Sequence, residues 1–215
     1  MEGTTYVAKR FYNIGGGTLA GVTPSQNYQN LYQEVCRAFQ GQWFLESFYK
    51  LVRERDIEAD MCSSSMFISS DVTQLAIDSD SEPEKAGAYW LIEPRRATSV
   101  HRWSGTMSHP AGAGQKAQTM SAFAHFVYRY SNSQLVAADL QSTVAAIDNA
   151  VVDVVFDMMT HTQDGNSGVG DHGQEGIDAF VKQHECNRIC MEMSLSGDNS
   201  SRKDRDSERD DSGSE

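Results

Sequence analysis

Hydrophobic and polar residues alternate near the start of the chain, and this alternation predicts a β-strand over residues 5–12. The alternation places Val7, Lys9 and Phe11 on one face of the strand. An ammonium group on an apolar face needs an anionic partner. Phosphate oxygens or Glu34 would supply that partner, and a lysine reaching to water from an edge strand is the alternative.

A helical period follows over residues 28–55, and this is the longest element that the pattern predicts. Its apolar stripe consists of Leu31, Val35, Ala38, Phe39 and Trp43. Shorter helices are predicted at residues 120–131 and, from the spacing of apolar positions, around 177–184. Apolar runs predict strands at residues 87–93, 134–141 and 150–156, whereas residues 76–86 and 104–119 have the composition of loops.

Composition narrows the class of protein. The chain has 215 residues, of which 39% are hydrophobic, so it can bury a substantial core. Its formal net charge of -12 argues against binding to nucleic acid or to an anionic membrane surface. No apolar run is long enough for a transmembrane helix, and no secretory signal is visible at the N-terminus. We therefore expect an intracellular, cytoplasmic protein, with residues 197–215 as a disordered acidic tail.

Clustered thiols near the C-terminus indicate a metal site, because four cysteines in a reducing compartment do not form a disulfide framework. Cys186 and Cys190 would project from one face of a helix, and His184 precedes them. Thiolates and imidazoles suit a tetrahedral zinc ion. The fourth ligand must come from elsewhere: the candidates are His125, which we prefer, and His161 or His172.

Oxygen ligands occur in the middle of the chain. Asp139 and Gln141 close the predicted strand at 134–141 and share one of its faces, and Asp157 follows the next apolar run. Two carboxylates and an amide oxygen suit a magnesium ion that carries nucleotide phosphates, although acidic residues at strand ends are more often solvated caps.

The glycines at Gly168, Gly170 and Gly173 form a loop that matches two known motifs poorly. A dinucleotide-binding fingerprint should follow a strand directly, but a polar segment at residues 157–167 intervenes. A calcium-binding EF-hand needs glycine at its sixth position, where this chain has Val169. A mobile backbone loop near a substrate is a better interpretation, with an ordinary surface loop as the alternative.

Taken together, these motifs resemble the alpha-kinase family, the atypical protein kinases that include elongation factor 2 kinase and the myosin heavy chain kinases. The matching segments, which extend from residue 6 to residue 195, are YVAKRF, YWLIEP, AFAHFVYRYS, VAADLQ, FDMMTHT, GVGDHGQEGI and HECNRIC. The segments FDMMTHT and GVGDHG are most similar in sequence to those of the fungal branch of the family.

The resemblance implies an α+β, two-lobed, protein-kinase-like fold with a zinc-pinned C-terminal lobe. Residues 1–93 would form a partial N-terminal lobe with the lysine strand, the long helix and the hinge strand, and residues 94–196 would form the catalytic lobe. The implied activity is transfer of the γ-phosphate of ATP to a serine or threonine hydroxyl of a protein substrate. The implied cofactors are ATP, Mg²⁺ and Zn²⁺.

The resemblance also implies a role for each candidate residue. Lys9 would contact the ATP phosphates, and Glu93 would lie at the hinge near the adenine. Asp139 would be the catalytic residue, with Gln141 and Asp157 on magnesium. The implied zinc ligands are His125, His184, Cys186 and Cys190, and the loop at Gly168, Gly170 and Gly173 would lie near the protein substrate.

Three departures from the family pattern keep a second function open. The strand and turn that precede the lysine strand in family members are absent here, so the small lobe is expected to be incomplete. Arg102 replaces a usual lysine and Ser142 a usual glycine. The alternative to an active kinase is therefore a catalytically impaired pseudokinase or a zinc-stabilised interaction module.

Overall fold

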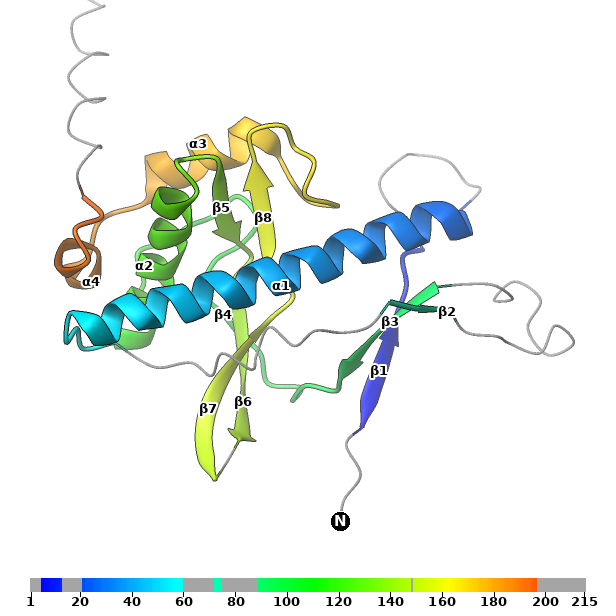
Figure 1. Ribbon diagram of the computed structural model, residues 1–215, viewed down its shortest axis with the longest axis horizontal. Helices are drawn as coiled ribbons and strands as arrows, with labels where there is room; N and C mark the ends of the chain where they lie inside the picture. Colours follow the sequence, from blue (N-terminus) through cyan, green and yellow to red (C-terminus); the bar gives the residue numbers. More distant parts are fainter. Residues whose placement is uncertain (1–4, 13–20, 60–71, 75–88, 148, 197–215) are drawn as a thin grey trace, which may run out of the picture.

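A long helix, α1 (Pro24–Glu54), runs along most of the molecule in the computed structural model (Figure 1). The structure describes residues 5–12, 21–59, 72–74, 89–147 and 149–196. Helix α1 begins four residues before the predicted position because Thr23 and Gln26 form a reciprocal capping box and proline occupies the first turn. With 31 residues, the helix is about 46 Å long.

The buried face of α1 differs from the predicted stripe. Leu31 is buried as expected, but Phe39 and Trp43 are 51% and 58% exposed. The stripe prediction was wrong at these two positions because the core contacts the opposite side of the helix. The buried residues of α1 are Asn27, Leu31, Arg37, Gly41, Phe44, Leu45, Phe48, Tyr49 and Val52.

Three antiparallel strands lie beside the N-terminal half of α1, in the order β1 (Tyr6–Lys9), β3 (Tyr89–Pro94) and β2 (Val72–Gln74). The buried side chain of Asn27 joins helix to sheet: its Nδ2 donates to the Tyr89 carbonyl at 2.7 Å, and its Oδ1 accepts from the Phe11 amide at 2.9 Å. The strands predicted at 5–12 and 87–93 are thus confirmed with shorter bounds, and the predicted loop at 76–86 lies outside the described residues.

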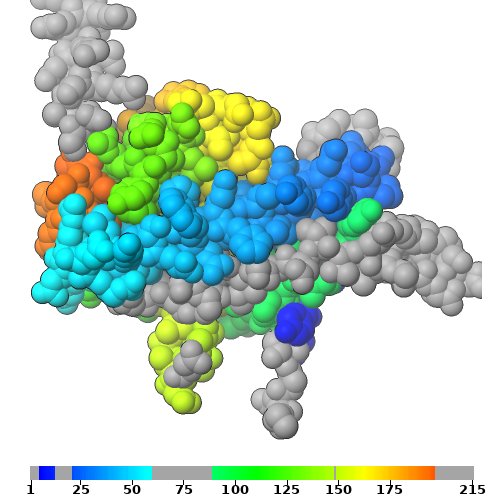
Figure 2. All heavy atoms as spheres, in the orientation of Figure 1, coloured from blue at the N-terminus to red at the C-terminus, as the bar shows by residue number. Residues whose placement is uncertain are grey.

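A second antiparallel sheet has the order β4 (His101–Arg102), β6 (Gln141–Ile147) and β7 (Ala150–Phe156). Strands β6 and β7 form a hairpin that projects from the body of the molecule (Figures 1 and 2). The strand predicted at 150–156 is confirmed.

The strand predicted at 134–141 is in fact two elements. Strand β5 (Leu135–Ala138) ends before Asp139, whose φ is +53°, and β6 begins at Gln141. β5 pairs with β8 (Met159–Thr162), a strand that the apolar pattern did not predict. Asp139 and Gln141 therefore do not share a face of one strand, because the chain turns between them.

Three helices complete the fold: α2 (Gln115–Tyr130), α3 (Gly173–Gln183) and α4 (Arg188–Glu192). The predicted helices at 120–131 and 177–184 correspond to α2 and α3, although both begin earlier. The core lies between α1 and α2, where Phe48 makes edge-on ring contacts with Phe123 and Phe126 at 5.7 and 5.6 Å. None of the described helices has the length and apolarity needed to cross a membrane, and the predicted disordered tail at 197–215 lies outside the described residues.

Candidate active site

A cleft of about 590 Å³ lies between the sheet of β1 and β3 and the strands that carry the predicted phosphate-handling residues. Its walls come from five parts of the chain: β1 with the residues that follow it, α1, β3, the β4–β8 region and the glycine loop. The lining residues are Ala8, Lys9, Arg10, Phe11, Tyr12, Leu31, Glu34, Trp90, Leu91, Arg102, Asp139, Gln141, Asp157, Met159 and Val169. The fold thus brings Lys9, Asp139, Gln141 and Asp157 together, although they are up to 148 residues apart in sequence.

Lys9 lies between two carboxylates. Its Nζ is 2.5 Å from Glu93 Oε2 on β3 and 2.5 Å from Asp157 Oδ1. Burial alone would lower the pKa of the Lys9 ammonium, but Asp157 and Glu93 outweigh that effect and raise its pKa above the usual value. The cleft therefore favours the charged form of Lys9, and the partners of this cation are Glu93 and Asp157.

Glu34, one of the two anions predicted to pair with Lys9, does not form that ion pair. Its carboxylate instead pairs with Arg37 one turn further along α1. Burial is the largest influence on Glu34 and raises its pKa, opposed by the charges of Arg37 and Lys9.

The two candidate aspartates stand at sharp turns of the chain. Asp139 and Asp157 have φ values of +53° and +51°, in the left-handed region that aspartate tolerates better than most residues. Gln141 lies opposite Phe156 in the β6–β7 ladder, which places it beside the start of the Asp157 turn. Arg102, on the neighbouring strand β4, has its Nη1 3.6 Å from Asp139 Oδ1.

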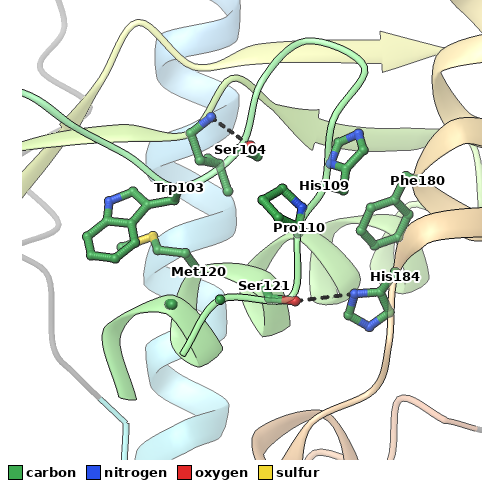
Figure 3. Close-up of a pocket in the computed structure, with 12 residues that line it drawn as sticks. Trp103, Ser104, His109, Pro110, Met120, Ser121, Phe180 and His184 are labelled. Carbon is green, nitrogen blue, oxygen red and sulfur yellow. Dashed lines mark hydrogen bonds between the residues drawn. The ribbon is translucent and has the colours of Figure 1, made fainter. Parts of the chain in front are cut away.

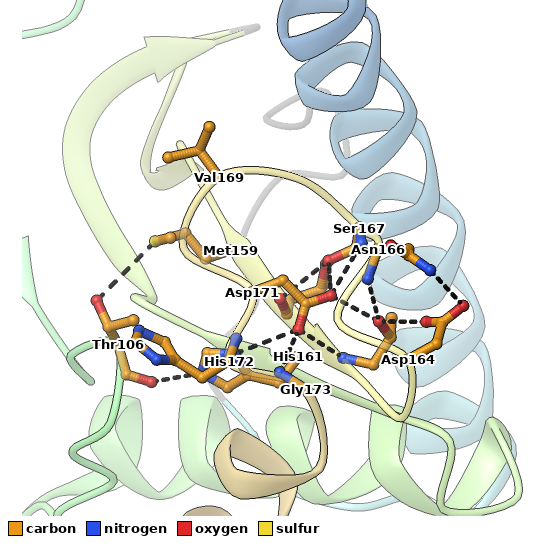
Figure 4. Close-up of polar contacts among 12 residues, drawn as sticks. Thr106, Met159, His161, Asp164, Asn166, Ser167, Val169, Asp171, His172 and Gly173 are labelled. Carbon is orange, nitrogen blue, oxygen red and sulfur yellow. Dashed lines mark hydrogen bonds and ion pairs between the residues drawn. The ribbon is translucent and has the colours of Figure 1, made fainter. Parts of the chain in front are cut away.

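The glycine loop is connected to both α1 and β8. Asp171, whose side chain is fully buried, accepts hydrogen bonds from Thr162, Ser167 and Gly173 (Figure 4). Burial raises the pKa of Asp171, but these hydrogen bonds outweigh that effect and lower it to about 2.

Buried Arg37 of α1 contacts the same loop. Its Nη1 donates to the Ser167 carbonyl at 3.0 Å. Gly168 has a φ of +132°, and a Cβ at this position would overlap the guanidinium group of Arg37. Gly168 is therefore required by the close approach of α1 as well as by its backbone conformation.

The four predicted zinc ligands lie close together where α2 meets the segment that follows α3. The ligand atoms of His125, His184, Cys186 and Cys190 all lie within 4.8 Å of one another. Nε2 of His184 is 3.0 Å from Nδ1 of His125, and the Cys186 and Cys190 sulfurs are each 3.7 Å from the nearer imidazole nitrogen. A tetrahedral zinc ion would separate two nitrogens by about 3.3 Å and a nitrogen from a sulfur by about 3.6 Å, so the side chains fit the ion.

The structure separates the candidates for the fourth position. His125, in α2, faces the other three groups, whereas His161 lies in β8 with its Nε2 2.6 Å from the Thr106 carbonyl. One predicted detail of the cluster is wrong: Cys186 precedes α4 instead of sharing a helix with Cys190.

Burial favours the uncharged forms of three of the four groups, His125, His184 and Cys190. Burial lowers the pKa of His125 to about 3 and that of His184 to about 4, and it raises the pKa of the Cys190 thiol to about 12. Outside the cluster, the Ser121 hydroxyl is 3.3 Å from Nδ1 of His184, the nitrogen that a metal bound at Nε2 would leave available (Figure 3).

Sequence reasoning missed the supporting roles of four polar residues, namely Arg37, Thr106, His161 and Asp171, although it considered His161 as a zinc ligand. Two of them were within reach, since His161 and Asp171 belong to the quoted motifs FDMMTHT and GVGDHGQEGI. The other two carry no local signal, because these contacts join residues more than fifty positions apart: Arg37 donates to the Ser167 carbonyl, and the Thr106 carbonyl contacts Nε2 of His161.

Comparison with known proteins decides which family combines these features. The family model described as the alpha-kinase family matches residues 1–190. The chain belongs to the alpha-kinase family. Its mixed helix-and-sheet fold agrees with this: the C-terminally truncated alpha-kinase domain of myosin heavy chain kinase matches with a TM-score of 0.56 and 25% identity over 78% of this chain and 59% of that domain.

The curated proteins that match this chain are named as protein kinases. Myosin heavy chain kinase A of Dictyostelium discoideum is 37% identical over 78 residues, which are 36% of this alpha-kinase chain and 6% of the relative. Human eukaryotic elongation factor 2 kinase is 36% identical over 89 residues, which are 41% of this chain and 11% of the relative. The alpha-kinase domain of myosin heavy chain kinase A in complex with AMPPCP is 25% identical, with a TM-score of 0.56 over 78% of this chain and 58% of that domain.

The chain therefore matches only a small part of the curated kinases and about three-fifths of the solved alpha-kinase domains. The relatives compared here come from Dictyostelium discoideum and human, so the assignment to the fungal branch stays a prediction.

Proposed function

We propose that this alpha-kinase chain is an ATP-dependent serine/threonine protein kinase. The observation that carries the proposal is the cleft in which the Lys9 cation, held between Glu93 and Asp157, faces Asp139 and Gln141. A cleft that holds a cation between carboxylates and presents further oxygen ligands has the charges that a metal-bound nucleoside triphosphate requires. The AMPPCP complex of a related alpha-kinase domain supports the same ligand class.

Little covalent chemistry is required of the protein in phosphoryl transfer, so positioning and charge carry most of the catalysis. In our proposal Lys9 binds phosphate oxygens, and Gln141 and Asp157 hold Mg²⁺, which neutralises charge on the phosphates when bound. Asp139 orients the attacking hydroxyl of a protein serine or threonine and accepts its proton. Glu93 pairs with Lys9 and, as the family resemblance implies, lies at the hinge near the adenine.

The proposed organisation follows the predicted boundaries. In our proposal, residues 1–93 belong to the N-terminal lobe and residues 94–196 to the catalytic lobe, with the glycine loop beside the protein substrate. Zinc held by His125, His184, Cys186 and Cys190 would pin the catalytic lobe by joining α2 to the segment that carries α4. Because thiolate ligands persist in reducing compartments, the proposal places the protein in the cytoplasm.

One observation favours the alternative, a catalytically impaired alpha-kinase module. Arg102 stands where the family has a lysine, and its guanidinium group lies 3.6 Å from the carboxylate of Asp139. An arginine that held this carboxylate in an ion pair would compete with the substrate hydroxyl. Its side chain is 68% exposed, however, so water weakens the pair.

Nucleotide binding separates the two functions when it is measured on matched variants. Lys9→Met should weaken Mg²⁺-ATP binding at least about tenfold, because it removes the cation that contacts the phosphates. Lys50→Met, on the exposed face of α1, is the control and should bind as the parent chain does. Asp139→Ala should bind Mg²⁺-ATP but not transfer phosphate. Equal binding by the Lys9 and Lys50 variants would contradict the proposed role of Lys9.

A further inference from the structure

Residues 103–107 close around the backbone of Asp139, and we call this segment the Asp139 clasp. The Asp139 amide donates to the Gly105 carbonyl at 3.1 Å, and the following amide, of Leu140, donates to Ser104 Oγ at 3.0 Å. The Thr106 hydroxyl is 3.5 Å from Asp139 Oδ2. Because Asp139 has a positive φ, which an isolated chain rarely adopts, these contacts select its conformation.

His161 lies behind the clasp, on β8, and contacts it through one atom. Its Nε2 is 2.6 Å from the Thr106 carbonyl, while its Nδ1 accepts the His172 amide at 3.0 Å. A carbonyl only accepts and an amide only donates, so the ring must carry its proton on Nε2. Both hydrogen-bonding partners are backbone groups, and together they fix the tautomer and the plane of the imidazole; the buried Asp171 carboxylate lies further away, 3.8 Å from Nδ1.

The imidazole cannot move away from this position. It is fully buried, and Gly176 of α3 packs directly on it, since a Cβ on Gly176 would overlap the ring. The residue beside His172 is Asp171, the buried carboxylate that gathers the glycine loop (Figure 4). One imidazole therefore joins the clasp that holds Asp139 to the end of the loop that lines the cleft.

We propose that His161 is a positioning residue for phosphoryl transfer: through the Thr106 carbonyl it sets the clasp, and through the clasp it sets the carboxylate of Asp139. The inference rests on the proposed kinase function for its kinetic consequence, but not for its geometry. A histidine that only filled the core would be replaceable by any side chain of similar size. A positioning histidine requires a donor at the place of its Nε2.

Two substitutions of similar size distinguish these roles. His161→Gln carries its amide at the distance of Nε2 and keeps a donor for the Thr106 carbonyl, whereas His161→Asn carries its amide at the distance of Nδ1 and cannot reach it. We expect His161→Asn to lower kcat at least about tenfold and His161→Gln to stay within about threefold of the parent chain. KM for ATP should remain within about twofold in both, because Lys9 and its partners are untouched.

A second readout does not depend on activity. Amide hydrogen exchange at Asp139 and Leu140 reports directly on the clasp, and it should accelerate in His161→Asn but not in His161→Gln. Asp178→Asn is the control, because Asp178 is exposed on α3, the helix that packs on His161, and its side chain accepts a hydrogen bond from Gln174 of the same helix. It should leave both kcat and the exchange of the Asp139 amide unchanged.

Each outcome decides the inference. Equal exchange and equal kcat in the asparagine and glutamine variants would overturn it. Accelerated exchange only in His161→Asn, in a chain without kinase activity, would support the positioning role and contradict the proposed function instead. If neither His161 variant folds, nitrogen NMR of the parent chain serves instead: the proposal requires the proton of His161 on Nε2, where it can bond the Thr106 carbonyl, and a proton on Nδ1 would refute it.

Discussion

Replacing Asp171 by asparagine should destabilise the protein in a way that depends on pH. The carboxylate is fully buried and accepts five hydrogen bonds from Thr162, Ser167 and Gly173. An asparagine keeps only one acceptor oxygen, so its amide nitrogen would face two or three donors. Unpaired buried donors and the lost charge-assisted bonds should together reduce stability by about 2–4 kcal/mol at pH 7.

The ionisation of Asp171 gives an independent magnitude. Its folded pKa of about 2 lies below the value of about 3.9 expected in the unfolded chain, so the folded state favours the carboxylate. A depressed pKa stabilises the protein above the unfolded pKa, and that stability is lost as pH falls through the folded pKa. The contribution is about 2.6 kcal/mol at pH 7, of which roughly half is lost at pH 3.

Urea unfolding at pH 7 and pH 3, followed by tryptophan fluorescence, measures this difference. Both chains should be kept free of metal with a chelator, because loss of a bound metal at pH 3 would otherwise contribute. Protonation of His125 and His184 is common to both chains and cancels in the difference. Asp178→Asn, on the exposed face of α3, is the control and should change the free energy of unfolding by less than about 0.5 kcal/mol. A loss in Asp171→Asn that is equal at the two pH values would refute the reasoning.

Three further predictions concern the packing and the cluster. Gly168→Ala should reduce the free energy of unfolding by at least about 1 kcal/mol in urea titrations, whereas Gly105→Ala, with ordinary backbone and contacts, should change little. Phe48→Ala should reduce the free energy of unfolding by about 3–5 kcal/mol in the same assay. Phe39→Ala should reduce it by less than about 1 kcal/mol, because Phe39 is half exposed. The reverse order would contradict the assigned buried face of α1. Zinc binding should release protons, because the Cys190 thiol is protonated in the metal-free protein, and the zinc affinity should rise about tenfold or more per pH unit between pH 6 and 8. Calorimetry in two buffers measures the protons released. No proton release would contradict the prediction.

The helices and the His/Cys cluster could be predicted from sequence because their signals are local. Three of the four converging groups lie within seven residues of sequence: His184, Cys186 and Cys190. His125 was preferred but not fixed by spacing, since only the packing of α2 excludes the other histidines. The start of α1 was missed although Thr23, three residues before Gln26, is a recognisable capping signal.

Tertiary packing explains the remaining differences. Phe39 and Trp43 were assigned to the core because both are apolar, but the side of α1 that meets α2 carries Phe44 and Phe48 instead. The turn at Asp139 interrupts a run of residues that reads as one strand, and its positive φ is stabilised by a loop more than thirty residues earlier. Such non-local support leaves no periodic pattern in the sequence.

Phosphate transfer from Mg²⁺-ATP to a basic protein such as myelin basic protein tests the central claim most directly. The parent chain should phosphorylate serine or threonine residues of this substrate. Asp139→Ala should reduce the rate by at least about a hundredfold, because it removes the group that orients the hydroxyl. Asp178→Asn should transfer phosphate at the parent rate. Absence of transfer by the parent chain, or transfer that survives Asp139→Ala, would contradict the account.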